Sequence, residues 1–199
     1  CDDNDNIWIG TNTGLDRFDP VYKTFKHYGK SDGFVGIEAN QNAVHKTSDG
    51  IIWYGTIHGL LRFDPSLDKA NTILPVTLIE EVKLFYNSFS YRDFADSING
   101  FTGLPVGLEL KDNNNHLTFN YVGISHVSPD KVTYRYMLEN FDKQWNPVTK
   151  STTTTYTNIP PGKYTFKVMA ANNDGVWDSK PATLSFTILP PFWQTAWFR

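Results

Sequence analysis

The histidines are the first residues to examine for chemistry, because imidazole binds transition metals and carries protons near neutral pH. No two of them have the H-x-x-x-H spacing that places two imidazoles on one helix face. We therefore predict turn or surface positions for them, and no metal site. They stand at His27, His45, His58, His116 and His126.

The acidic opening, Asp2 to Asn6, has the composition of a calcium-binding loop. Counted from Asp3, however, it lacks the glycine at position six and the glutamate at position twelve that such a loop needs. The chain also has no glycine-rich phosphate loop and no G-x-S-x-G motif, and nothing local joins Ser, His and Asp into a triad. We predict a segment without catalytic residues or cofactor.

Trp8 and Trp53 could stack on sugar rings, because an aromatic face suits the apolar face of a pyranose. They recur, however, at the same place in a repeated unit, which favours packing between the units. Residues that bind a ligand are expected on the variable loops instead, such as Lys30–Gly36 or Thr56–His58. The sequence does not choose among these loops.

The repeated unit is NIWIGTNTGLDRFDP at residues 6–20 and IIWYGTIHGLLRFDP at residues 51–65, offset by 45 residues with ten of fifteen positions identical. This period, with about four short strands per unit, is typical of a β-propeller blade. The Gly-His and Trp-Asp signature of one propeller class is missing. The expected strands are 6–11, 15–19 and 22–28 in a truncated first blade, then 41–46, 51–56, 60–63 and 72–78.

The second half shows no further copy of the repeat and alternates with period two. Apolar faces are predicted for 108–110, 117–121, 134–138, 164–170 and 184–188, and for Val76, Leu78, Val82 and Leu84 with Glu80 interrupting. About seven strands, most of them with one polar face, predict a two-sheet antiparallel sandwich of immunoglobulin or fibronectin-III type. The predicted domains are 1–74 for the propeller blades, 75–189 for the sandwich and 190–199 for an exit segment.

Two short motifs in the second half stand out. In Pro160-Pro161-Gly162-Lys163-Tyr164, the tyrosine opens a strand just after a turn, so its hydroxyl can return to the loop backbone as a tyrosine corner. The final PPFWQTAWFR places aromatic residues beside an arginine, which is typical of a membrane–water interface. The other interpretation of this tail is an exposed or edge-packed segment.

Composition excludes some function classes. The formal net charge is -3 with acids and bases mixed in both halves, so a nucleic-acid partner is not expected. The single cysteine, Cys1, excludes an internal disulfide framework. The sequence also lacks a signal peptide and a run of apolar residues long enough to span a membrane.

Both halves resemble one receptor family. The repeat WIGT-x-x-GL-x-RFDP is similar to the propeller repeat of two-component regulators. The stretches LTFNYVGIS (117–125), SPDKVTYRYMLENFDKQW (128–145), TTYTNIPPGKYTFKVMAANNDGVW (154–177) and ILPPFWQTAWFR (188–199) resemble the three-tyrosine domain that follows those propellers. Glu139-Asn140 departs from the family, where a glycine often precedes Phe-Asp. The signature residues are Trp8, Gly10, Gly14, Trp53, Gly55, Gly59, Tyr134, Tyr136, Trp145, Gly162 and Tyr164.

The resemblance implies the periplasmic sensor of a bacterial transmembrane histidine kinase, often a hybrid kinase of the Bacteroidetes type that detects oligosaccharides. It implies a homodimer, a membrane helix after Arg199 and a kinase beyond it, with the catalytic domains outside this chain. The alternative is a binding or spacer module without signalling. Because one blade and part of another leave faces uncovered, we also expect self-association, or packing of the blades on the sandwich.

Overall fold

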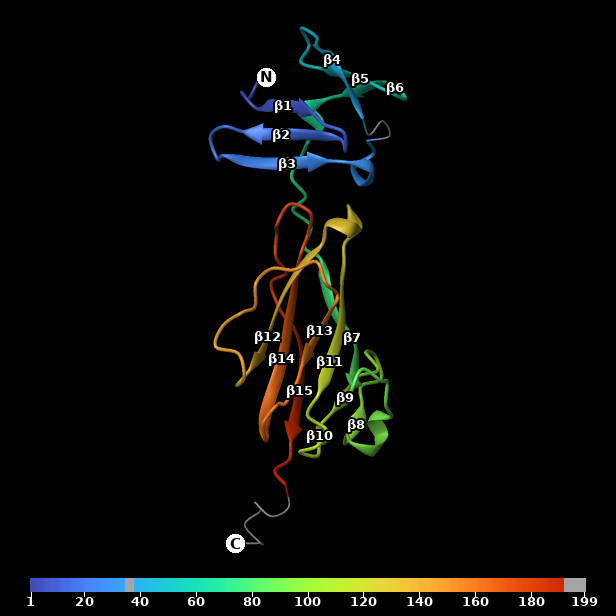
Figure 1. The fold of residues 1–199 in the computed structure, drawn as a ribbon, viewed down its shortest axis with the longest axis vertical. Coiled ribbons are helices and arrows are strands. Elements are labelled where there is room, and N and C mark those ends of the chain that lie inside the picture. Colours follow the sequence, from blue (N-terminus) through green and yellow to red (C-terminus); the bar gives the residue numbers. More distant parts are fainter. Residues whose placement is uncertain (35–37, 192–199) are drawn as a thin grey trace. The chain divides into compact units, whose positions relative to one another are not determined.

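The structure is a computed structural model that describes residues 1–34 and 38–191. The fold is all-β and divides into two compact units, Cys1–Ala70 and Asn71–Arg199 (Figure 1). The sequence places the boundary a few residues later, after residue 74. Each unit has a hydrophobic cluster of its own.

The first sheet of the N-terminal unit is antiparallel and three-stranded, in the order β1-β2-β3. Gly14 lies in the turn between β1 and β2 at a φ of 142°. A Cβ there would lie 2.2 Å from the carbonyl oxygen of Tyr28, so only glycine fits. The strands are β1 (Ile7–Gly10), β2 (Leu15–Asp19) and β3 (Thr24–Tyr28).

The second sheet has the order β4-β5-β6, and the turn Asp49-Gly50 joins its first two strands. The predicted fourth blade strand at 72–78 is wrong. Residues from Val76 onward instead begin a strand of the C-terminal unit, where they pair with Ile124 and its neighbours. The strands are β4 (Ala39–Lys46), β5 (Ile52–Thr56) and β6 (Gly59–Phe63), with short 3-10 helices η1 (Lys30–Asp32) and η2 (Pro65–Leu67) before and after the sheet.

One face of the first blade sheet packs against one face of the second. The ring of Trp8 on β1 lies 4.6 Å from that of Phe63 on β6, and Phe34 lies 6.4 Å from Tyr54 on β5, between centroids. Gly10 is small because a Cβ there would lie 2.6 Å from the Cβ of Ala39. The buried members of this core are Leu15, Tyr28, Phe34, Ile52 and Tyr54.

The C-terminal unit is a sandwich of two sheets, in the orders β10-β15-β14-β12 and β13-β11-β7, with a small β8-β9 hairpin beside them (Figure 1). Pairing is antiparallel except between β10 and β15, which run parallel. The strands are β7 (Val76–Leu84), β8 (Ser97–Ile98), β9 (Pro105–Val106), β10 (Leu108–Leu110), β11 (Leu117–Ile124), β12 (Thr133–Glu139), β13 (Thr153–Tyr156), β14 (Gly162–Ala171) and β15 (Ala182–Ile188), and the 3-10 helices are η3 (Tyr91–Asp93) and η4 (Pro129–Lys131).

The predicted apolar face of β7 is wrong in its first half. Val76 and Leu78 are 56% and 36% exposed, while Thr77 and Ile79 point inward. The register against β11 shifts between Asn120 and Tyr121, which leaves Glu80 as the extra residue of a β-bulge. A bulge changes the phase of the side chains, so the faces on its two sides do not continue one another.

The other predicted faces form the sandwich core. Phe119 of β11 stacks on Phe166 of β14 at 4.0 Å between ring centroids, which joins the two sheets. Burial of such aromatic side chains supplies most of the free energy that holds the layers together. Other fully buried members are Val82, Leu108, Leu110, Leu117, Tyr121, Leu138, Ile159, Val168 and Ile188.

Candidate functional site

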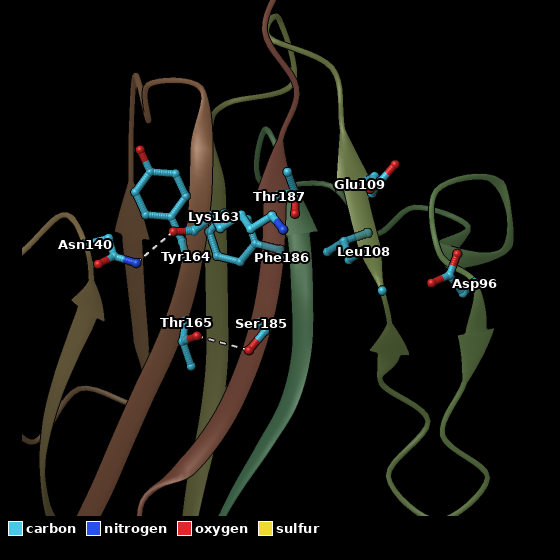
Figure 2. A pocket seen from close by; sticks show the side chains of 11 residues that line it. Asp96, Leu108, Glu109, Asn140, Lys163, Tyr164, Thr165, Ser185, Phe186 and Thr187 are labelled. Atoms are coloured by element: carbon cyan, nitrogen blue, oxygen red, sulfur yellow. Dashed lines mark hydrogen bonds between the residues drawn. The ribbon is translucent and has the colours of Figure 1, made fainter.

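The candidate site is a shallow groove on the outer face of the four-stranded sheet, near the end where β15 leaves the sandwich (Figure 2). Its centre is a row of hydroxyl side chains. Thr165 on β14 and Ser185 on β15 lie 3.0 Å apart, oxygen to oxygen. The groove is lined by Asp96, Gly107, Leu108, Glu109, Asn140, Lys163, Tyr164, Thr165, Ser185, Phe186 and Thr187.

The groove carries charged side chains of both signs, and they do not form ion pairs with one another in the described structure. Glu109 and Lys163 both pair in register with Thr187, one from each neighbouring strand. Neither has an ion-pair partner in the part of the chain that the structure describes. With Asp96, the surface therefore offers two carboxylates, one ammonium group and hydroxyls to a polar partner.

The tyrosine corner expected at Tyr164 is present. Its hydroxyl donates to the carbonyl oxygen of Pro160 at 2.9 Å, and its ring stacks on Phe186 at 5.6 Å between centroids. Gly162 fits because a Cβ there would lie 3.1 Å from the Tyr164 hydroxyl oxygen and 3.3 Å from two carbons of its ring. Burial raises the pKa of Tyr164, so the hydroxyl stays protonated as a donor. The corner fixes the loop that feeds β14, next to the end of β15.

Tyr134 and Tyr136 lie on β12 and contribute to the core. The Tyr134 hydroxyl accepts a hydrogen bond from the backbone N–H of Gly123 at 3.0 Å, which bridges the two sheets. Tyr136 lies 6.3 Å from Tyr156 between ring centroids. Both signature tyrosines therefore hold the sandwich together and do not point into the groove.

Trp145 lies beside Arg135, and so does a second tryptophan. The guanidinium carbon of Arg135 is 5.1 Å from the ring centroid of Trp145 and 4.6 Å from that of Trp177. Such cation–π contacts fasten two loops to the outer face of β12. No local pattern reveals the contact of Trp177, because its partner Arg135 stands far away in sequence.

The FDKQW stretch contains a hydrogen-bonding centre that sequence reasoning missed. One carboxylate oxygen of Asp142 accepts from the backbone N–H of Leu138 at 2.7 Å, from the Asn146 amide at 3.0 Å and from the Tyr156 hydroxyl at 2.5 Å. Burial, together with this carboxylate, raises the pKa of Tyr156. Asn140, where the family often has glycine, takes a φ of 71°, which asparagine tolerates.

The two repeat tryptophans have different surroundings. Trp8 packs on Phe63 and donates through its indole nitrogen to Asp2 at 2.7 Å. Trp53 lies half-buried on the opposite face of its own sheet, beside Arg62. The same repeat position therefore faces the shared core in one copy and the outer surface in the other.

The repeat glycines have structural roles. Gly59 lies at the position of the second copy that corresponds to Gly14 in the first, and its φ is 130°. A Cβ at Gly55 would lie 2.8 Å from the Cβ of Ala43. Of the two loops proposed for ligand binding, Thr56–His58 comprises the last residue of β5 and the turn that leads to β6. In the other loop, Lys30–Gly36, residues 35 and 36 lie outside the described residues.

Within residues 1–34 and 38–191, no group of three His, Cys, Asp or Glu side chains could hold a metal ion. In the same ranges, no helix is long and apolar enough to cross a membrane. The aromatic tail from Phe192 to Arg199, expected near a membrane, lies outside the described residues.

Comparisons with known proteins agree with this fold. Residues 125–189 match the Y_Y_Y domain. The chain superposes over 95% of its length on the extracellular domain of the putative hybrid two component system BT3049 from B. thetaiotaomicron, with a TM-score of 0.73 and 27% identity. The corresponding domain of BT4673 from the same organism shares the fold, at a TM-score of 0.51, 22% identity and 96% coverage of this chain.

Histidine kinase P4 of Formosa agariphila is 24% identical over 192 residues, which are 96% of this chain and 14% of that protein. The chain likewise covers 25% of the BT3049 and BT4673 domains, so it spans a minor part of each relative.

These findings define the class: the chain combines blade-like β-sheets with a sandwich and is similar to the extracellular domains of two-component sensor kinases. More particularly, residues 125–189 of the C-terminal unit are similar to the Y_Y_Y domain.

Proposed function

We propose that the chain is part of the periplasmic sensor of a transmembrane hybrid histidine kinase. The observation that carries this proposal is the likeness, over almost the whole chain, to the extracellular domain of a putative hybrid two component system. In this proposal the kinase domains belong to other parts of the protein, and this segment recognises and relays without catalysing a reaction.

The proposed ligand is an oligosaccharide, bound by the intact sensor as a homodimer. Ligand binding would favour one arrangement of the paired sandwiches over another, since a ligand shifts an equilibrium only by binding one state better. Strand β15 then carries the change to the membrane helix. Support comes from its place inside the sheet, with β14 on one side and β10 on the other, and from the bond between Leu189 N–H and the Leu110 carbonyl at 2.8 Å.

A glycine insertion tests the relay. Three glycines placed after Leu189 in the full receptor would decouple β15 from whatever follows the Pro190-Pro191 pair. We expect ligand-dependent autophosphorylation to be lost while ligand binding is kept. Three glycines after Gly100, in the exposed turn of the β8–β9 hairpin, are the matched control and should leave signalling intact. Full signalling by the first variant would refute the relay through β15.

A panel of oligosaccharides, screened by thermal shift on the intact extracellular region, tests the ligand class. Binding stabilises a folded protein in proportion to the logarithm of ligand concentration over Kd, so a true ligand raises the Tm progressively. Binding without any change in phosphorylation would favour the second function, a binding or spacer module. If no oligosaccharide in the panel raises the Tm, the proposed ligand class is wrong.

A further inference from the structure

The connection between the two units is fastened at both of its ends, each end to its own unit. On the N-terminal side, the chain leaves β6 and forms the short helix η2, which Asp64 caps by accepting from Ser66 N–H at 3.1 Å. The backbone N–H of Asp68 then donates to the Pro65 carbonyl at 3.2 Å. The chain is therefore ordered as far as Asp68.

Asp68 is tied to the first blade sheet by its side chain. Its carboxylate accepts from the Arg17 guanidinium at 2.5 Å, from the Lys26 ammonium at 3.2 Å and from the Tyr28 hydroxyl at 2.5 Å. The Asp68 side chain is 10% exposed, so solvent screens these contacts little. Hydrogen bonds between charged groups are about twice as strong as neutral ones. Asp68 thus closes the N-terminal unit.

On the C-terminal side, Asn172 attaches the incoming chain to the sandwich. Asn172 is 2% exposed, and its amide nitrogen donates to the carbonyl oxygens of Asn71 at 2.6 Å and Ile73 at 2.9 Å. Its amide oxygen accepts from the backbone N–H groups of Asp174 and Val176, each at 3.0 Å. One buried amide therefore holds the incoming chain with one end and shapes its own turn with the other.

Two further contacts strengthen this second attachment. The backbone N–H of Asn71 donates to the Asp174 carboxylate at 2.7 Å. The Thr77 hydroxyl donates to the Asp178 carboxylate at 3.1 Å and accepts from the backbone N–H of Ala170 at 3.0 Å. The chain from Asn71 onward therefore belongs to the sandwich.

Only Lys69 and Ala70 lie between the two attachments. Both are exposed, and the sole hydrogen bond recorded for them in the described structure is from Lys69 N–H to the Leu67 carbonyl, at 2.9 Å. The N–H of Ala70 points to no protein acceptor within the described residues. We propose that Lys69–Ala70 is the pivot of the chain, and that backbone rotation between the two units is confined to these two residues. This inference does not depend on the proposed ligand or signal.

Backbone ¹⁵N relaxation of the intact chain tests the pivot directly. Order parameters near ~0.85 mark a rigid backbone and values below ~0.6 a flexible one. We expect rigid values from Asp64 to Asp68 and from Asn71 to Ile73, with a minimum at Ala70. Uniformly rigid values across 64–73 would overturn the proposal, and so would low values throughout that stretch.

Two substitutions separate the attachments. Asn172→Asp keeps the oxygen acceptor for the turn but removes the amide donor, so order parameters should fall at 71–73 and stay high at 64–68. Asp68→Ala should do the reverse. Asn99→Asp is the matched control, because Asn99 also caps a turn, accepting from Phe101 and Thr102, without touching the connection. Should either variant leave its own side of the connection rigid, that attachment is not what confines the pivot.

Discussion

At the scale of single residues, the Tyr164 hydroxyl tests how much one side-chain hydrogen bond contributes to the stability of the sandwich. Removing it in Tyr164→Phe breaks the bond to the Pro160 carbonyl but keeps the ring on Phe186. We expect a loss of about 1 kcal/mol in the free energy of unfolding, the usual worth of one hydrogen bond. Urea denaturation measures it.

Tyr121 is the matched control, because its hydroxyl is buried without a hydrogen-bond partner in the described structure. Tyr121→Phe removes a polar group that has no partner, so it should be neutral or stabilising. If the two variants lose equal stability, the corner bond contributes nothing of its own.

Asp2 links the stability of the N-terminal unit to pH. Burial alone would raise the pKa of Asp2, but hydrogen bonds from Trp8, Asn6 and Asn4 outweigh it and lower the pKa below 3.8. A carboxylate with a depressed pKa stabilises the fold above its unfolded pKa, and this stability is lost as the pH falls through the folded pKa.

Asp2→Asn should therefore destabilise the chain at pH 6, by about 1–3 kcal/mol for bonds to a charged group, and by progressively less below about pH 4. Chemical denaturation at several pH values, followed by tryptophan fluorescence, measures this difference. Asp3→Asn is the control, because among the described residues Asp3 pairs with Lys46 alone, in an exposed ion pair. This substitution should change stability by less than about 1 kcal/mol. A constant difference between Asp2→Asn and the natural protein at all pH values would contradict the prediction.

At the scale of elements, Gly123 on β11 shows how closely the sheets approach. A Cβ there would lie 2.6 Å from the Cβ of Ala170 and 2.8 Å from Cγ1 of Val132. Gly123→Ala forces the sheets apart, and overpacking of this kind costs about 1–3 kcal/mol. Thermal or urea unfolding measures the loss.

Gly100→Ala is the control for that substitution, because nothing lies within 4 Å of the added Cβ. Its effect should stay within about 0.5 kcal/mol, as for most surface changes. Equal losses for the two alanine variants would mean that chain entropy, and not the sheet contact, sets the cost.

The strands were largely predictable because each sandwich face repeats every second residue. The failures have local causes. The bulge at Glu80 depends on the register that β11 imposes, which no pattern within β7 reveals. The strand predicted at 72–78 has blade-like composition, but pairing with β11 decides its sheet.

The polar centres were harder to predict than the strands. Asp142 and Asn172 both lie within stretches that resemble the family. What Asn172 binds, however, is backbone about a hundred residues earlier, at Asn71 and Ile73. Any residue type can supply a backbone carbonyl as acceptor, so the sequence does not reveal which residues accept these hydrogen bonds. The groove was missed for a similar reason, because its lining comes from five separate segments.

At the scale of the whole molecule, the repeat creates complementary outer faces on the N-terminal unit. The outer face of the second sheet carries Trp53 and Leu60, the repeat counterparts of Trp8 and Leu15 in the core. The outer face of the first sheet carries Ile7 and Phe18, the counterparts of the core residues Ile52 and Phe63. The outer face of each sheet therefore carries the repeat counterparts of the residues with which the other sheet forms the core.

We expect this chain to self-associate head to tail through those faces. A heterologous contact of this kind need not close into a ring, so the mean mass should rise with concentration. Sedimentation velocity measures it. Leu60→Ser should reduce the association. Phe101→Ser is the control: it also replaces an exposed apolar side chain with serine, at a more exposed residue of the other unit, and should leave the association unchanged. A constant monomer mass at all concentrations would rule out the contact.

The parallel pair β10 and β15 has a mechanical consequence. Leu108, Glu109 and Leu110 pair with Phe186, Thr187 and Ile188, while β14 holds β15 along its other edge from Gly162 to Val168. A pull on the chain beyond Leu189, directed along β15, loads these bonds together in shear instead of opening them one after another. The last strand of the sandwich should therefore resist tension as a stiff tether, and yield only when the sheet breaks as a whole.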